Sequence, residues 1–413
     1  MDTKNFNDKP YNLISVSGSY PTFDHLVQKS MKSKILILTA AFAGLASAGE
    51  APQPESVETA HICDLMKSIG KVYENSENPY IQEVKFYGRA QWQYGYTDGE
   101  GLEGDKFSDN YTELRRLRAG AQVRLFNKIK VKGSVNLEQG GTGQHRFGLQ
   151  SLDTASVTYD AGSVFGLDDL NISYGRHKVT VSAESHESSR KLKTVERSNI
   201  GNFFTSGKRA TGFTVSAEKF ETEFNLGVYS TDEGDYLGSW NTGEAYYLGV
   251  ERGAWNADFI YNDVDVSAGV ATEDDLFDYR WATSLAYEAQ YGRWNVLLNG
   301  VYGEDLSNQE VYGVVLMPST FLIEDKLEAV ARYQYAASEG DNLSLTKRYA
   351  GKAGDVEKGR KGSENHTVYT GLNYYMCGHR AKVQAGVEYE KLERENRETA
   401  DAVTVWAAFR MYF

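Results

Sequence analysis

The stretch Ser188–Ser198, "SSRKLKTVERS", concentrates positive charge in a chain whose formal net charge is −13. It holds one anion, Glu196, and its cations are Arg190, Lys191, Lys193 and Arg197. A guanidinium binds phosphate or carboxylate oxygens through a forked pair of N–H donors, and an ammonium acts as a point charge. These residue types suit the binding of small anions, although most charge runs are only solvated loops. The stretch has neither a helical nor a strand pattern, so its meaning depends on the elements around it.

An export signal begins at Met31, with a basic start, an apolar run and the small residues Ala-Ser-Ala. This layout predicts a secretory signal peptide over residues 31–48 that is cleaved after Ala48, and the apolar run is too short for a spanning helix. Residues 1–30 are then an upstream extension ahead of the true initiator. The alternative is that they form a long leading region of the signal.

The composition favours β-structure, because aromatic residues make up 13% of the chain and prolines number only 6. No apolar run near 20 residues lies beyond the export signal, so we expect no membrane-spanning helix. The acidic balance excludes a nucleic-acid partner, which would need a basic face.

Short runs alternate apolar and polar residues from about Val84 to the end of the chain. In residues 112–125, alternate positions are apolar and the positions between them are polar or basic, and successive side chains of a strand point to opposite sides. Residues 129–138 repeat the pattern after a tight turn. The basic residues that we expect on one common face are Arg89, Arg116, Arg118, Lys130 and Lys132.

About sixteen such runs are present. They are centred near residues 84–96, 112–125, 129–138, 153–159, 169–176, 209–217, 221–230, 243–251, 255–263, 279–290, 293–302, 309–317, 326–337, 366–376, 380–390 and 403–413. Tight turns alternate with longer polar connections at 97–111, 177–208, 231–242, 264–278 and 338–365. This short–long alternation is typical of a sixteen-stranded antiparallel transmembrane β-barrel, in which an even strand count returns the chain to its starting side. A closed barrel also leaves no unpaired backbone edge in lipid.

A secreted soluble sandwich or propeller is the rival architecture, because its strands alternate as well. The apolar face of the first strand carries Trp92, Tyr94 and Tyr96, which fits the aromatic girdles of a membrane barrel. The chain ends on Phe413, on the apolar face of the last strand. We expect the barrel-assembly machinery to read this terminal aromatic residue as its signal. Both features favour a barrel over residues 83–413.

A periplasmic segment, residues 49–82, is expected before the barrel. Its apolar residues between Ile62 and Tyr73 have helical spacing, which predicts a short helix that caps the barrel loosely. The two cysteines are Cys63 in this helix and Cys377 in a tight turn on the same side. Because both thiols would face an oxidising compartment, we expect them to pair and to pin the helix beneath the barrel.

The sequence gives little support for catalysis or for metal binding. Residues 184–188, "ESHES", include nucleophile, base and carboxylate types, but adjacent residues do not point at one another and no glycine elbow surrounds the serines. The 7 histidines lack paired-ligand spacing, so we expect no metal and no cofactor. An outer-membrane hydrolase is a minor alternative.

Several segments are similar to one known family, and the most specific part is the stretch "SSR…ERS" at the end of residues 175–198. The others are residues 79–96, 113–126, 321–335, 369–389 and the terminal "WAAFRMYF". Together they resemble the phosphate-selective porin O and P family of Gram-negative outer membranes, over about residues 80–413. The resemblance implies a homotrimer of sixteen-stranded barrels, each narrowed by an inward-folded third extracellular loop. The lysines between Ser189 and Glu196, and the nearby Glu184 and Glu187, depart from the family pattern and leave the preference for phosphate open.

The connection 177–208 follows the fifth run, which makes it the third connection on its side of the barrel. If it folds inward, as the resemblance implies, its charges would face a narrow aqueous lumen in which fields are focused. We therefore expect an outer-membrane porin for small anions, phosphate or a related anion. The expected constriction residues are Arg190, Lys191, Lys193 and Arg197, extended by Arg116, Arg118, Lys130, Lys132 and Arg89. Arg197 and Glu196 could equally anchor the loop to the barrel wall.

The other expected partners are outer-membrane lipid, lipopolysaccharide and further copies of the chain. Two alternatives stay open. One is a general, non-selective porin, and the other is a structural or adhesive barrel whose pore is closed by the long loop.

Overall fold

The structure, a computed structural model, describes residues 57–139, 147–204, 208–232, 238, 240, 243–264, 277–346 and 361–413. The extension 1–30, the signal peptide 31–48 and the cleavage site at Ala48 lie outside these residues. None of the described helices combines the length and the apolar character needed to cross a membrane.

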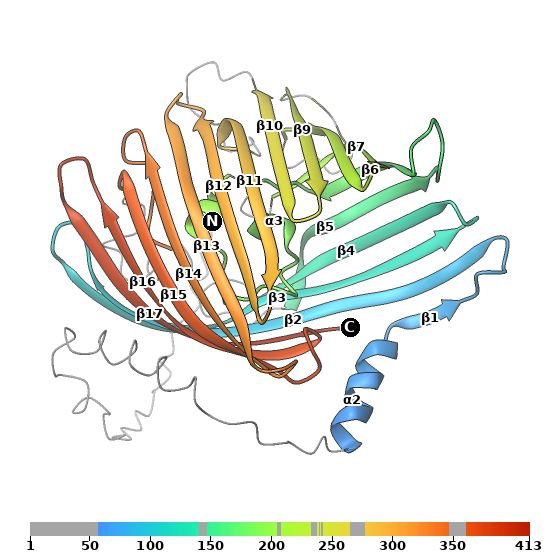
Figure 1. Cartoon of the computed structure of the whole chain (residues 1–413), viewed down its shortest axis with the longest axis horizontal. Helices are drawn as coiled ribbons and strands as arrows, with labels where there is room; N and C mark the ends of the chain where they lie inside the picture. Colours follow the sequence, from blue (N-terminus) through green and yellow to red (C-terminus); the bar gives the residue numbers. More distant parts are fainter. Residues whose placement is uncertain are drawn as a thin grey trace, which may run out of the picture. The chain divides into compact units, whose positions relative to one another are not determined.

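Sixteen antiparallel strands, β2 to β17, form a closed ring in which strands that follow one another in sequence pair side by side (Figure 1). They are β2 (Ile81–Glu100), β3 (Lys106–Leu125), β4 (Ile129–Gln139), β5 (Phe147–Asp160), β6 (Asp169–Lys178), β7 (Arg209–Lys219), β8 (Thr222–Ser230), β9 (Gly243–Arg252), β10 (Trp255–Val264), β11 (Tyr279–Tyr291), β12 (Trp294–Asp305), β13 (Glu310–Ile323), β14 (Leu327–Ser338), β15 (Glu364–Tyr375), β16 (Ala381–Glu393) and β17 (Thr399–Tyr412). The ring closes where β17 pairs with β2. Each run expected from the sequence corresponds to one of these strands, because alternating polarity matches a sheet with one apolar face.

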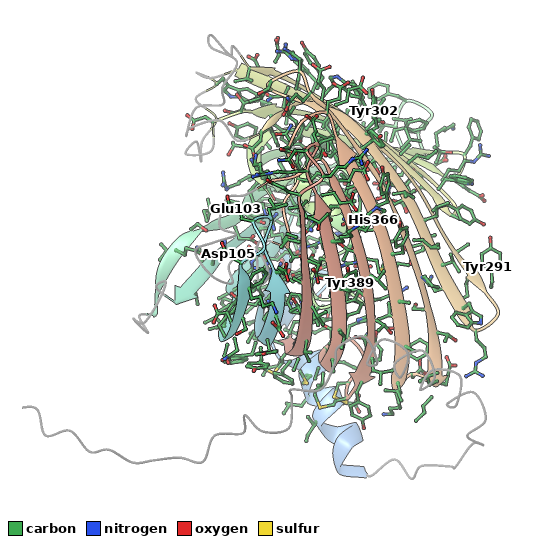
Figure 2. The ribbon with its side chains drawn as sticks, turned by 90° about the vertical axis from the view of Figure 1, so that its left-hand side faces the viewer. Glu103, Asp105, Tyr291, Tyr302, His366 and Tyr389 are labelled. Atoms are coloured by element: carbon green, nitrogen blue, oxygen red, sulfur yellow. A yellow bond between two sulfur atoms is a disulfide. The ribbon has the colours of Figure 1, made fainter. Side chains whose placement is uncertain are left out.

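The outer face of the ring is apolar and aromatic, and the inner face is polar. On β2, Trp92 and Tyr94 are exposed on the outside, whereas Gln91 and Gln93 between them are buried inside. Tyr291 and Tyr302 lie near opposite ends of the β11–β12 hairpin (Figure 2). Alternation along each strand therefore separates the two faces.

The first expected connection, 97–111, proved to be mostly strand, so that prediction was wrong. β2 runs to Glu100 and β3 begins at Lys106, which leaves only residues 101–105 between them. The polar side chains stay in the ladder, as in the pair Thr97↔Asp109. Backbone hydrogen bonds hold such a hairpin whatever the polarity of its side chains, so polarity alone does not mark where it ends.

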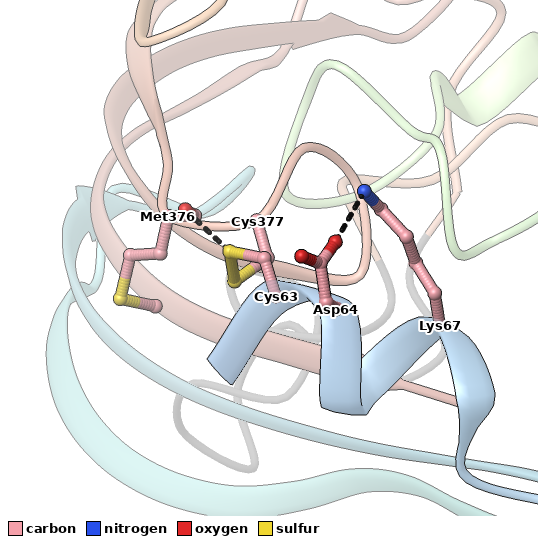
Figure 3. The surroundings of a disulfide bond; sticks show 5 residues. All are labelled: Cys63, Asp64, Lys67, Met376 and Cys377. Atoms are coloured by element: carbon pink, nitrogen blue, oxygen red, sulfur yellow. Dashed lines mark hydrogen bonds and ion pairs between the residues drawn. A yellow bond between two sulfur atoms is a disulfide. The ribbon is translucent and has the colours of Figure 1, made fainter. Parts of the chain in front are cut away.

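The N-terminal segment is a helix followed by a short extra strand, α2 (Val57–Ser68) and β1 (Lys71–Glu74). Gly70, with a φ of +92°, ends the helix before the apolar spacing runs out, as glycine commonly does. β1 pairs with the start of β2, outside the ring. Cys63 of α2 is joined by a disulfide to Cys377 in the β15–β16 turn (Figure 3).

A segment between β6 and β7 lies inside the ring. It carries two short helices, α3 (Ala183–His186) and α4 (Asn199–Phe203), and Figure 1 shows α3 among the strands. We call its described residues 179–204 the inner segment. Hydrogen bonds connect it to side chains of β2, β3, β10, β12 and β14–β17, which surround it on several sides.

Candidate functional site

A buried arginine on β14 anchors the inner segment. Only 1% of the Arg332 side chain is exposed. Its Nη1 donates to Glu184 Oε1 at 3.0 Å and to the carbonyl oxygen of Glu196 at 2.8 Å, both in the inner segment. Its Nη2 donates to Glu388 Oε2 on β16 at 2.8 Å. A buried charge needs such partners, because burial without them costs several kcal/mol.

Two further cations of the same side bind backbone oxygens of the inner segment. Lys382 Nζ on β16 donates to the carbonyl oxygen of Leu192 at 2.6 Å. Arg410 on β17 donates through Nη1 to the carbonyl oxygen of Ser189 at 3.3 Å and through Nη2 to that of Val195. Arg332, Lys382 and Arg410 therefore each donate at least one hydrogen bond to the inner segment.

Apolar packing fastens the inner segment to the same side. Val195 is fully buried in a cluster with Val330, Tyr369 and Trp406, which come from β14, β15 and β17. Nearer the other end of the barrel, Val181, Ile200 and Phe204 join a second buried cluster. Burial of such side chains is worth about 1.5–3 kcal/mol each, so the segment is a packed part of the fold.

The neighbouring part of the lumen wall, beyond the β17–β2 pairing, is basic and only partly covered. We call it the cationic wall, and it consists of Arg89, Arg116, Arg118, Lys130 and Lys132 on β2–β4, with Arg209 on β7. All of these side chains are partly exposed. Within the part of the chain that the structure describes, Arg89, Lys130 and Lys132 take part in no ion pair. Arg89 donates to Ser189 Oγ at 2.6 Å, and Lys132 Nζ lies 5.5 Å from the ring centroid of Tyr87.

One carboxylate, Asp153 on β5, lies against the cationic wall. Its Oδ1 is 2.8 Å from Arg118 Nη1 and 3.0 Å from Arg209 Nη2, and Ser134 Oγ donates to its Oδ2 at 3.1 Å. Asp153 thus holds the guanidinium groups of Arg118 and Arg209 in the wall. The other cations of the wall keep their charge toward the lumen. Such a surface attracts small anions from water.

The sequence profile of the family described as phosphate-selective porin O and P matches residues 84–291. The chain belongs to this family. It is therefore an outer-membrane porin, and its β-barrel is a channel rather than an enzyme. A comparison with curated protein sequences finds no match.

Solved structures share the fold of this porin. The outer membrane channel DcaP of Acinetobacter baumannii aligns with a TM-score of 0.52 at 14% identity, covering 83% of this chain and 99% of that one. An anion-selective porin from Comamonas acidovorans gives a TM-score of 0.52 at 14% identity, with 80% and 99% covered. Salmonella typhi OmpF in complex with daunomycin gives 0.51 at 11% identity, with 82% and 100% covered. At these identities the likeness concerns the fold alone.

The cations of residues 188–198 make different contacts in the porin. The guanidinium of Arg190 lies 4.8 Å from the ring centroid of Tyr412 and is partly exposed. Lys191 is exposed, whereas Lys193 Nζ is 3.4 Å from Glu288 Oε1 on β11. Only Arg190 and Lys191 of this group are therefore accessible without a carboxylate partner in the described chain.

Arg197 and Glu196 make the contacts of anchors. Arg197 is 7% exposed, and its guanidinium donates to the carbonyl oxygens of Glu184 at 2.5 Å and Glu187 at 2.7 Å, at the end of α3. Burial lowers the pKa of Arg197, and the neighbouring carboxylates of Glu184 and Glu196 oppose that shift. Arg197 thus holds the inner segment together and does not line the accessible space.

The partner of Glu196 is Arg115, which strict alternation with Arg116 and Arg118 would place on the outer face of the ring. Arg115 Nε lies 2.6 Å from Glu196 Oε1. A register shift between β2 and β3 pairs Gln91 with Arg116 but Trp92 with Leu114, so Arg115 is the extra residue of a β-bulge and turns inward. The adjacent arginines "RR" were the available signal, because a regular strand would put one of them in lipid at a cost of about 2–4 kcal/mol.

Proposed function

We propose that this porin conducts small anions, phosphate among them, through the space between the inner segment and the cationic wall. The observation that carries the proposal is that Arg89, Lys130 and Lys132 are partly exposed and in no ion pair in the described chain. A lumen with low-dielectric walls focuses their field and raises the local anion concentration. Several moderate contacts in series suit conduction, because a single tight site would trap the ion.

In this proposal Arg190 and Lys191 line the side of the path that faces the cationic wall. Lys193 contributes charge while it also contacts Glu288. Arg197 positions the segment without touching the anion, since its side chain is buried and two of its guanidinium nitrogens donate to backbone oxygens. The inner segment then corresponds to the third extracellular loop.

We also propose the membrane arrangement that the family implies. Tyr291 and Tyr302, at opposite ends of one hairpin, are placed as interface anchors of a transmembrane barrel. The signal peptide directs export, Phe413 is read by the assembly machinery, and the barrel forms a homotrimer surrounded by lipid and lipopolysaccharide. Chemical cross-linking of the purified porin in detergent tests the trimer. The largest cross-linked product should contain three chains.

Single-channel recording of the refolded porin in a planar bilayer tests the conduction of anions. We expect a reversal potential of anion-selective sign in a chloride gradient, and a saturable block of chloride current by added phosphate. The variant Lys130→Gln/Lys132→Gln should lower the anion-to-cation permeability ratio several-fold, because it removes about two charges from the lumen wall.

A matched variant controls for the loss of charge itself. Lys128→Gln/Arg252→Gln removes two exposed cations at the short-turn end of the barrel and should leave the reversal potential unchanged. Open channels without ion preference would make the protein a general porin. Absence of conductance would contradict a channel and favour a structural barrel.

A further inference from the structure

We propose that α2 and β1 form a disulfide-fastened lock across the β17–β2 seam. This seam is the one contact of the described ring that joins strands distant in sequence, from Asp401↔Glu100 to Tyr412↔Arg89. Every other pair in the ring is a hairpin or a connection between consecutive strands, so the seam has no covalent turn to hold it. The lock concerns how the barrel stays closed and does not depend on which ion the porin conducts.

β1 continues the hydrogen-bond ladder of β2 where β17 ends. The last residue of the chain still pairs with β2, because Gly88 N donates to Phe413 O at 3.3 Å and Phe413 N donates to Gly88 O at 3.2 Å. Next along β2, Phe86 N donates to the carbonyl oxygen of Gly70 at 2.7 Å. β1 then pairs Lys71 with Lys85. The edge of β2 beyond β17 is thereby covered, as an open strand edge requires.

Two glycines let these segments come together around the terminal aromatic ring. A Cβ placed on Gly88 would lie 2.9 Å from ring carbons of Phe413. A Cβ on Gly70 would lie 2.2 Å from the carbonyl oxygen of Phe86 and 3.3 Å from the Phe413 ring. Only glycine leaves room for both approaches. The hinge between α2 and β1 thus packs directly on the C-terminal residue of the seam.

The disulfide connects α2 to the strands on the other side of β17, because it ends in the turn before β16. Cys63 precedes β1, which is bound to β2, and Cys377 lies in the turn between β15 and β16 (Figure 3). β16 pairs with β17 on the side opposite β2, so the cross-link spans the last strand. The two cysteines are 314 residues apart in sequence. β17 cannot separate from β2 fully unless β1 detaches or the disulfide breaks.

Hydrogen–deuterium exchange of the folded porin in detergent tests the lock region by region. In Cys63→Ser/Cys377→Ser we expect amides of residues 81–89 and 399–413 to exchange at least about tenfold faster than in the parent protein. Amides of the β9–β10 hairpin should keep their rates, because that contact lies on the far side of the ring. The reversal potential should also stay unchanged, which separates this test from that of anion conduction.

Two engineered disulfides test whether a covalent link at the seam restores slow exchange. Met411 and Ala90 lie opposite each other across the seam, and Leu248 and Phe259 do so between β9 and β10. In the serine background, a disulfide from Ala90→Cys/Met411→Cys should restore slow exchange at the seam, and one from Leu248→Cys/Phe259→Cys should not. Should the serine variant fail to refold, reduction of the folded parent protein by dithiothreitol, which is oxidised to its cyclic disulfide, gives the same comparison. Equal acceleration in the β9–β10 hairpin, or no acceleration at the seam, would overturn the proposal.

Discussion

Arg332 and Arg118 both point into the barrel, yet 1% of the Arg332 side chain is exposed and 17% of that of Arg118. The difference follows from the inner segment, which packs against β14–β17 and leaves the cationic wall on β2–β4 partly open. On the first side, cations bind carboxylates and backbone oxygens of the inner segment. On the second side, three cations have no carboxylate partner in the described chain.

The comparison shows that an inward cation can serve either the fold or the ligand, according to what covers it. A buried ion pair loses its hydration, so removing one partner leaves a costly unpaired charge. A partly hydrated cation loses little when it is removed, but its field in the lumen disappears with it. Substitutions on the two sides should therefore separate stability from selectivity.

The largest effect on stability is expected for Arg332→Met. The variant leaves the carboxylates of Glu184 and Glu388 buried without their guanidinium, so the free energy of unfolding should fall by about 3–5 kcal/mol. Urea unfolding in detergent, followed by tryptophan fluorescence, measures it. Arg89→Met is the control from the cationic wall and should cost less than about 1 kcal/mol. Equal losses would remove the distinction between the two sides.

A smaller loss is expected for Arg115→Gln, at the bulge of β3. The variant removes the guanidinium that Glu196 binds but keeps some hydrogen-bonding capacity, so we expect a loss of about 2 kcal/mol in the same assay. Arg116→Gln, one residue along, keeps the inner segment's ion pair and is the matched control. If the control is the more damaging variant, Arg116 rather than Arg115 anchors the segment.

The pH dependence of stability should carry a contribution from His379, in the β15–β16 turn beside Lys382. Burial, assisted by the Lys382 charge, lowers the pKa of His379 from 6.5 to about 4. The unfolded chain then binds a proton that the folded chain does not, so this contribution to stability falls as the pH drops from about 6.5 toward 4. After allowance for partial exposure the contribution is about 1–2 kcal/mol. His379→Gln should flatten this part of the pH profile, and an unchanged profile would contradict the burial argument.

The smallest stability effect is expected for Lys193→Gln. The side chains of Lys193 and Glu288 are 20% and 48% exposed, and ion pairs of this kind contribute about 0.2–1 kcal/mol. A change in reversal potential with unchanged stability would assign Lys193 to the conduction path. Loss of stability without a change in reversal potential would place it among the anchors.

The strands could be predicted because alternation is a local property of the chain. The spacing of Arg118 and Lys132 alone predicted that both lie on the inner face, and both lie there in the structure. Alternation does not place Arg115 on the inner face, because a bulge arises from the pairing of two strands and leaves no mark on the period within one of them. Alternation could also have placed Lys382 inward, but its partner, the Leu192 carbonyl oxygen, lies 190 residues away in sequence.

The amino-acid sequence by itself determined the number of strands in the ring and most of the residues that share its inner face, because the side-chain period of a strand is 2 wherever the strand lies. Only the tertiary structure decided which inward cations remain available. The inner segment could pack against any side of a barrel lined with polar residues, and it packs where Val195 finds apolar neighbours and Arg332 finds two carboxylates. Those contacts join residues far apart in the chain, so the charge left on the cationic wall is a property of the folded barrel.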